Sequence, residues 1–168
     1  MRGFTLIELV IVVLIVAVLA VAAMPSFSVA ASDMRADSAA RAMLGHLRYA
    51  QSVAVSQNKI IAVQFETGGY YIAEVTSMAT ALDGSKVGGT VLTDPISRLP
   101  MRFMNNGPGP FRGVTVVTAN FGGQAWFAFD PTGAPSSGGS VEIDYGGRRR
   151  TITVAVGTGR VTATGDAE

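Results

Sequence analysis

The hydrophobic period of the chain changes twice, and each change marks a different element. Residues 9–24 contain no polar side chain. After a run of small residues, apolar positions recur at alternating spacings of four and three up to about Gln57, which predicts an amphipathic helix. Its apolar stripe consists of Ala36, Ala40, Met43, Leu47, Ala50 and Ala54. From residue 58 the period is two, as in β-strands, so we expect an α+β protein whose long N-terminal helix packs on an antiparallel β-rich head.

Two arrangements fit the junction between the apolar and the amphipathic segments. Ser32 or Asp33 could cap a separate second helix, or one helix could run through Pro25 with a kink. In the second case residues 4–57 would form a rod about 80 Å long. Pro25 is therefore predicted to bend the helix in the second case.

The period-two region predicts a head at residues 58–164 and a loose tail at residues 165–168. The first two strands form a hairpin through a Glu-Thr-Gly-Gly turn. Residues 76–98 read as a loop with one short strand, and Asn105–Pro110 as a break. Strands are expected at residues 60–65, 70–75, 90–92, 99–104, 114–119, 124–129, 141–145, 151–156 and 160–164.

Glu8 is the one charged residue of the N-terminal apolar segment. Residues 4–24 would span about 31 Å as a helix, enough to cross a hydrocarbon core of about 30 Å. A carboxylate at that depth costs on the order of 3 kcal/mol, so a functional partner is expected. Cleavage after Gly3 would create an amine at Phe4, one helical turn from Glu8.

The predicted leader is residues 1–3, and it differs from a secretory signal, whose cleavage site follows the apolar stretch. Cleavage after Gly3 would leave residues 4–24 on the mature protein as a transmembrane and assembly helix. Arg2 precedes this helix and the next basic residue is Arg35, so the N-terminus is expected in the cytoplasm. The alternative is a plain signal anchor whose Glu8 reaches toward the near interface.

Composition supports one small domain on this helix. The 143 residues after Pro25 suffice for a single core, and their 12 basic and 11 acidic side chains leave them nearly neutral. The chain has no cysteine, so the external head must depend on packing without disulfides. A strongly charged general nucleic-acid binder is excluded.

Residues 3–8, Gly-Phe-Thr-Leu-Ile-Glu, and the apolar helix after them resemble the prepilin motif of type IV pilins and type II secretion pseudopilins. The resemblance implies a prepilin peptidase that cuts after Gly3 and methylates Phe4. Many of these proteins also carry a helix-perturbing proline where Pro25 lies. The disulfide-closed loop of many major pilins has no counterpart here, because cysteine is absent.

The C-terminal half is similar to the family of minor pseudopilin H and fimbrial protein T. The matching segments are Leu47–Ala54 on the helix, Phe127–Gly133 and Gly157–Val161, while residues 76–112 are unmatched. The resemblance implies a minor subunit, at or near the tip of a secretion pseudopilus or type IV pilus. It would be a single-pass bacterial inner-membrane protein with a periplasmic head, whose partners are other pilin subunits, the peptidase and membrane lipid.

Nothing in the sequence predicts an enzyme, a cofactor or a metal site. His46 is the only histidine, and it reads as a solvated or packed helix residue. The carboxylates of Asp130, Glu142 and Asp144 are too scattered for a metal or glycosidase site. Glycines 138–139 and 146–147 read as hairpin residues that need positive φ, not as a phosphate cradle.

A basic run at Arg148, Arg149 and Arg150 raises DNA binding as an alternative function. Some fimbrial T-type proteins bind DNA through a C-terminal Gly-Arg-x-Arg pattern. Residues 147–150, Gly-Arg-Arg-Arg, match this pattern but lie upstream of the position that it has in those proteins. At the corresponding position this chain has Gly159-Arg160-Val161-Thr162, in which threonine replaces the second arginine. Arg160 is therefore the fourth candidate for DNA contact.

A structural role for the same run is also expected. A two-residue turn at Gly146-Gly147 would place Asp144 opposite Arg149 and Tyr145 opposite Arg148. The sequence therefore predicts an ion pair in the first case and a cation–π contact in the second.

Overall fold

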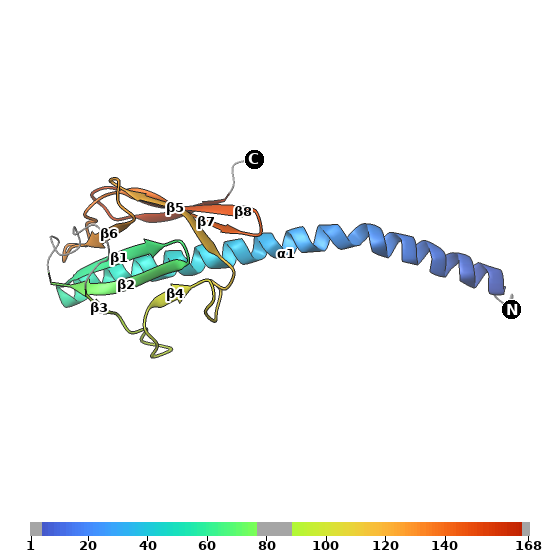
Figure 1. The fold of residues 1–168 in the computed structure, drawn as a ribbon, viewed down its shortest axis with the longest axis horizontal. Helices are drawn as coiled ribbons and strands as arrows, with labels where there is room; N and C mark the ends of the chain where they lie inside the picture. Colours follow the sequence, from blue (N-terminus) through green and yellow to red (C-terminus); the bar gives the residue numbers. More distant parts are fainter. Residues whose placement is uncertain (1–4, 77–88, 166–168) are drawn as a thin grey trace.

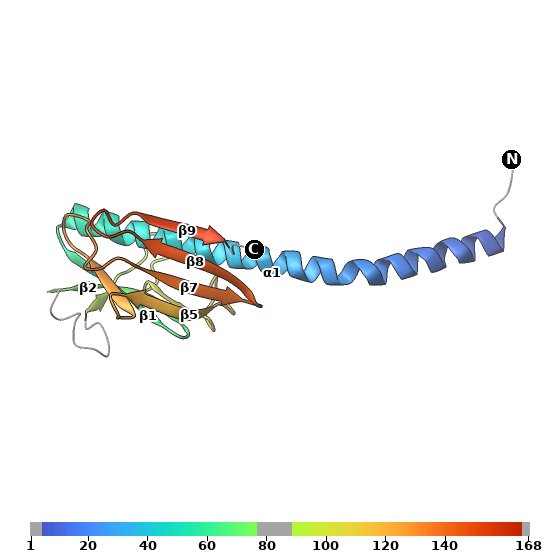
Figure 2. The ribbon, with the colours of Figure 1, turned by 90° about the horizontal axis from the view of Figure 1, so that it is seen from above.

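A computed structural model describes residues 5–76 and 89–165, with the backbone alone for residues 21–28. One helix, α1 (Leu6–Gln57), runs the length of the molecule, and the head lies along its C-terminal half (Figures 1 and 2). The strands are β1 (Ile60–Glu66), β2 (Gly69–Val75), β3 (Thr90–Val91), β4 (Arg102–Met104), β5 (Thr115–Phe121), β6 (Trp126–Phe129), β7 (Gly139–Tyr145), β8 (Arg148–Val154) and β9 (Val161–Gly165). The predicted α+β class is therefore confirmed. The predicted tail at residues 165–168 lies, apart from Gly165, outside the described residues.

The two helical segments form a single helix of 52 residues that continues through Pro25. The alternative in which Ser32 or Asp33 caps a second helix is therefore wrong. Thr5 caps the N-terminus, and Asn58 ends the helix in the left-handed conformation with φ 54°. Figures 1 and 2 show α1 curved rather than straight, as expected of a long helix with an internal proline.

The C-terminal half of α1 supplies the helical side of the core. All six residues of the predicted stripe are buried, none more than 3% exposed. Four of the six are alanines, whose small side chains let the strands approach the helix backbone closely. Met43 and Leu47 fill the space between, and burial of each contributes about 2 kcal/mol.

The head consists of two antiparallel sheets packed on the helix. The first has the order β3-β2-β1-β6 with β4 also paired to β2, and the second has the order β5-β7-β8-β9. The predicted β1–β2 hairpin is present, with Ile60 opposite Val75 and Glu66 opposite Gly69, so the strands extend into the four residues expected as the turn. The contacts of α1 reach β1 and β6 in one sheet and β7, β8 and β9 in the other. One core therefore joins the helix and both sheets.

Two strands begin three residues away from the expected position. β4 begins at Arg102 rather than at residue 99, because Arg98 adopts φ 60° and Pro100 has no amide hydrogen to donate. β8 begins at Arg148 rather than at residue 151, so all three consecutive arginines lie in a strand. The short strand expected near residue 90 is present as β3.

Candidate assembly segment and basic hairpin

Glu8 takes part in a capping box at the start of α1. Its Oε2 accepts hydrogen bonds from the Thr5 amide at 3.0 Å and from Thr5 Oγ1 at 2.9 Å. Thr5 Oγ1 in turn accepts from the Glu8 amide at 3.3 Å. This reciprocal arrangement satisfies two amides that a helix start would leave unpaired. Gly3 and Phe4, the predicted processing residues, lie outside the described residues.

The N-terminal half of α1 projects away from the head (Figure 1). From Leu6 to Leu19 the large hydrophobic side chains are 51–83% exposed. The exposure extends all around the helix, unlike the single stripe that α1 buries against the head. Among the described residues, no helical segment meets the combined length and apolarity needed to span a membrane.

The basic hairpin is defined as β7, β8 and the turn between them. Gly146-Gly147 forms the predicted two-residue turn, with φ values of 59° and 82° that glycine adopts without strain. The predicted register is confirmed: Asp144 lies opposite Arg149, and Tyr145 lies opposite Arg148. The contacts made by these side chains, however, differ from the prediction.

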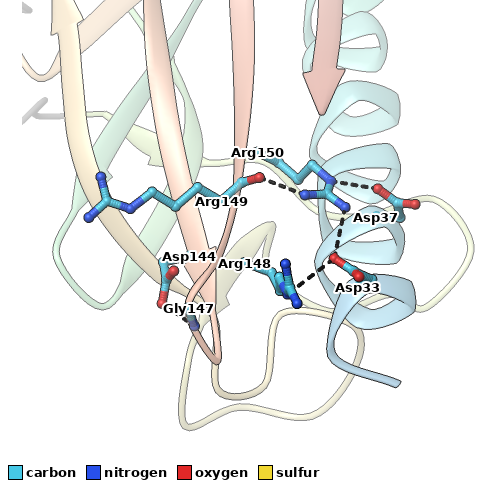
Figure 3. A network of polar contacts seen from close by, with 7 residues as sticks. All are labelled: Asp33, Asp37, Asp144, Gly147, Arg148, Arg149 and Arg150. Atoms are coloured by element: carbon cyan, nitrogen blue, oxygen red, sulfur yellow. Dashed lines mark hydrogen bonds and ion pairs between the residues drawn. The ribbon is translucent and has the colours of Figure 1, made fainter. Parts of the chain in front are cut away.

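Two arginines of the hairpin pair with two acids of α1 (Figure 3). Arg150 Nε donates to Asp37 Oδ1 at 2.7 Å, and Arg150 Nη2 lies 3.4 Å from Asp33 Oδ1. Arg148 Nε lies 3.5 Å from the same Asp33 oxygen. The Arg150 side chain is only 11% exposed, so these bonds are formed partly out of water. This network fastens β8 to the helix where α1 leaves the head.

The predicted ion pair between Asp144 and Arg149 is wrong. Arg149 Nη1 instead pairs with Glu142 Oε1 at 3.0 Å. Glu142 is the diagonal neighbour on the same face of β7, and a long arginine reaches a diagonal position readily. Asp144 Oδ2 accepts from the Gly147 amide at 3.3 Å and so supports the turn.

The predicted cation–π contact between Arg148 and Tyr145 is also wrong, because a residue of α1 takes that place. The guanidinium carbon of Arg35 lies 5.5 Å from the centre of the Tyr145 ring. Arg35 Nη1 also donates a hydrogen bond to the Tyr145 hydroxyl. Tyr145 therefore joins β7 to α1 on the side of the helix away from Asp33.

Three of the four arginines considered for DNA contact are thus paired with carboxylates of the same head. Arg160 is exposed, and its amide donates to Thr158 Oγ1 at 3.3 Å. It lies at the other end of the head from the three hairpin arginines, near Gln51, whose Nε2 donates to the Thr158 carbonyl at 3.2 Å. The structure does not bring the four arginines together, and the DNA-binding alternative gains no support.

His46 packs against the head. Its ring stacks on Phe103 with 4.0 Å between centroids, and Nδ1 lies 2.7 Å from the Tyr70 hydroxyl. Burial lowers the pKa of His46, and the charge of Asp94 opposes this to a smaller extent. Burial raises the pKa of Tyr70 well above its usual value, so its hydroxyl stays protonated beside the imidazole.

The acids considered and rejected as a catalytic or metal site each have a local partner. Asp130 Oδ1 accepts from the Thr132 hydroxyl at 2.6 Å, from the Thr132 amide at 2.8 Å and from the Ala134 amide at 3.0 Å. The bond from the hydroxyl lowers the pKa of Asp130 most, and the bonds from the amides lower it further. Asp130 therefore fixes the turn that follows β6.

Sequence reasoning missed the roles of Asp33 and Asp37. Their spacing of four puts both carboxylates on one face of α1, and the spacing of two puts Arg148 and Arg150 on one face of β8. Both spacings can be read from the sequence. Predicting that these acids pair with these arginines, however, requires knowing how the helix crosses the sheet.

A long N-terminal helix, half packed on an antiparallel head and half projecting as an uncovered apolar rod, is the arrangement of a type IV pilin-like subunit. The family described as Type II transport protein GspH matches residues 39–159. The prokaryotic N-terminal methylation motif matches residues 1–24. The chain therefore belongs to the GspH family and carries a prepilin-type N-terminus. No curated protein matched the chain at a significant level.

Solved structures show the same fold in minor subunits of both filament systems. The minor pseudopilin EpsH from the type II secretion system of Vibrio cholerae superimposes with a TM-score of 0.54 at 13% identity, over 81% of this chain and 97% of that one. The type IV minor pilin FimU of Pseudomonas aeruginosa superimposes with a TM-score of 0.50 at 20% identity, over 77% of this chain and 87% of that one. The pilin-like fold is therefore shared with both.

Proposed function

We propose that the chain is a minor filament subunit that assembles through the N-terminal half of α1. The observation that carries this proposal is the exposure of every large apolar side chain from Leu6 to Leu19. An uncovered rod of this kind is unstable in water, since burying one such side chain contributes about 2 kcal/mol. Membrane lipid before assembly and the helices of other pilin subunits after it would both cover the rod.

Processing by a prepilin peptidase is part of this proposal. The peptidase would cut after Gly3 and methylate Phe4, leaving residues 4–24 on the mature chain. Before assembly this segment would anchor the protein in the bacterial inner membrane, with its N-terminus in the cytoplasm and its head in the periplasm. The methylation motif at residues 1–24 supports this route.

Glu8 would set the position of each new subunit relative to its neighbour in the filament. Its carboxylate would neutralise the Phe4 amine of an adjacent subunit within an apolar bundle, where an unpaired charge is costly. In the unprocessed chain Glu8 forms the capping box with Thr5. Thr5 is the residue after Phe4, whose amine cleavage would create. Cleavage would therefore give each subunit an amine one helical turn from its own Glu8, so that the two groups that pair between subunits lie at the same end of the helix.

We place the subunit at or near the filament tip, in keeping with the resemblance to minor pilins and pseudopilins. Deletion of the gene, scored in one strain for protein secretion, surface motility and DNA uptake, tests the function. Loss of secretion or of motility, restored by the intact chain, is the expected result. A deletion that leaves both unchanged would contradict the proposal, and loss of DNA uptake alone would favour a DNA receptor.

A further inference from the structure

A cavity of about 520 Å³ lies where α1 leaves the head. Arg35 and Ser38 line it from α1, and Tyr145 lines it from the end of β7. The loop at residues 109–113, which includes Arg112, closes the opposite side. The cavity is therefore built from three separate parts of the chain that the fold brings together.

The charged side chains that line this cavity are both positive. The acids nearest to Arg35 in sequence, Asp33 and Asp37, are two residues away on α1 and so face another side of the helix, where they bind β8. Among residues 5–76 and 89–165, no carboxylate forms an ion pair with Arg35 or Arg112. A cleft lined by one sign of charge concentrates the field and attracts anions.

The arginine on the helix side is held in position before any ligand arrives. Arg35 uses one of its five N–H donors on the Tyr145 hydroxyl and lies over the Tyr145 ring, which leaves further donors for a ligand. Gly113, at φ 79°, lets the loop approach this ring closely, since a Cβ there would lie 3.0 Å from Tyr145 Cε2. Arg35 and the loop at Gly113 thus both lie against the Tyr145 ring.

We propose that this cavity binds an aspartate or glutamate carboxylate of a neighbouring filament subunit, with Arg35 and Arg112 as its donors. The inference rests on the proposed filament function and adds a second contact, on the head, to the one made by Glu8. Guanidinium groups bind carboxylates through two parallel hydrogen bonds. These bonds fix the orientation of the partner and also strengthen its binding.

Two other sources of an anion fit less well. If residues 4–24 cross the membrane, Arg35 lies about 16 Å beyond the end of the span, whereas the headgroup layer is only about 5–7 Å thick. Lipid phosphate is therefore out of reach. A free inorganic anion would fill a small part of the cavity, since a water occupies about 30 Å³. A segment of another protein that presents a carboxylate also brings its backbone and adjacent side chains, and so fills more of the cavity.

Zero-length cross-linking in assembled filaments tests this inference. The variant Arg112→Lys places an amine at the cavity, and a carbodiimide then joins this amine to any carboxylate in direct contact through an amide bond. A second variant, Ser38→Lys, puts the amine on the helix side and retains both arginines. The matched control is Arg160→Lys, an exposed arginine at the other end of the head. The native pair Lys59–Glu74, with 2.7 Å between Nζ and Oε2, reports that the reagent has reacted.

The expected result is an isopeptide link from position 112 and from position 38 to an acidic residue of another subunit, located by mass spectrometry of the digest. The Arg160→Lys filaments should lack it. Filaments that contain the variants and show the Lys59–Glu74 link, but no intermolecular link at either position, would overturn the inference and leave the proposed function standing. Links as frequent from Arg160→Lys would overturn it as well. Absence of the wild-type chain from filaments would instead refute the proposed function.

Discussion

Arg150 and Asp37 join β8 to α1 through a hydrogen bond of 2.7 Å between Nε and Oδ1, although 113 residues separate them in the chain. The same guanidinium reaches Asp33, so that one arginine of β8 is bonded to two successive turns of α1. The bonds lie at the place where the projecting half of the helix begins (Figures 1 and 3). This contact therefore adds polar bonds to the apolar packing that holds β8 against α1.

Arg150→Ala is expected to lower the free energy of unfolding by about 1–3 kcal/mol, because it removes the partly buried partner of Asp37 and leaves Asp33 with Arg148 alone. Arg149→Ala is the matched control on the same strand. Its side chain is 58% exposed, so the expected loss is below about 1 kcal/mol. Urea unfolding of the full-length chain in detergent measures both, and equal effects of the two substitutions would contradict this account.

The stability of the head should fall as the pH falls through the titration of His46. Burial lowers the pKa of His46 in the folded state, so the unfolded chain binds the proton more readily. The stabilisation is then complete above the unfolded pKa of about 6.5 and is lost as the pH falls through the lower folded pKa. Because His46 is the only histidine, its NMR titration needs no assignment, and a pKa at or above about 6.5 would refute the burial argument.

The His46→Gln variant provides the control for this pH dependence. It removes the titrating ring but keeps a side chain that can accept from Tyr70. Unfolding free energies at pH 7.5 and pH 5 should differ less in this variant than in the wild type. An unchanged difference would assign the pH dependence to other groups.

The sequence predicted the parts of the fold that depend on local pattern. The stripe on α1 and the Gly146-Gly147 turn are encoded by period and by turn chemistry, and both are present. The bounds of β4 were less accurate, because the interruptions at Arg98 and Pro100 depend on how the loop before β4 closes. Period alone carries no information on such a closure.

The contacts of the basic hairpin could not be derived from its register. Register identifies the residue opposite, but Arg149 is long enough to prefer its diagonal neighbour Glu142. Tyr145 makes its hydrogen bond and its cation–π contact with Arg35, which is 110 residues away in the chain. Contacts at this separation follow from the packing of α1 on the sheet, which no local pattern specifies.

DNA binding by the hairpin is expected to be weak. Arg148, Arg149 and Arg150 are neutralised by acids of the head, and few charges remain to displace counterions from phosphate. Titration of the full-length chain with duplex DNA should give a dissociation constant weaker than about 1 μM at about 150 mM salt. Tighter binding that disappears when Arg148, Arg149 and Arg160 become alanine, with the fold intact, would restore the DNA-receptor alternative.

Glu8→Gln separates the charge of Glu8 from its role in helix capping. Glutamine can still accept from Thr5 in a capping box, so the helix start and its processing should be preserved. The variant cannot neutralise the Phe4 amine of a neighbour, and its incorporation into filaments should fall several-fold. Quantitative immunoblots of sheared filaments against whole cells give the ratio, and wild-type incorporation would refute the pairing mechanism.

The central claim is that the chain enters a filament as a processed subunit that retains its N-terminal helix. Intact-mass analysis of the protein recovered from purified filaments tests this most directly. We predict a mass that lacks Met1–Gly3 and carries one additional methyl group, located on Phe4 by fragmentation. Recovery of the unprocessed chain, or of a protein that begins near Pro25, would contradict the account, because neither species presents a Phe4 amine to a neighbouring Glu8.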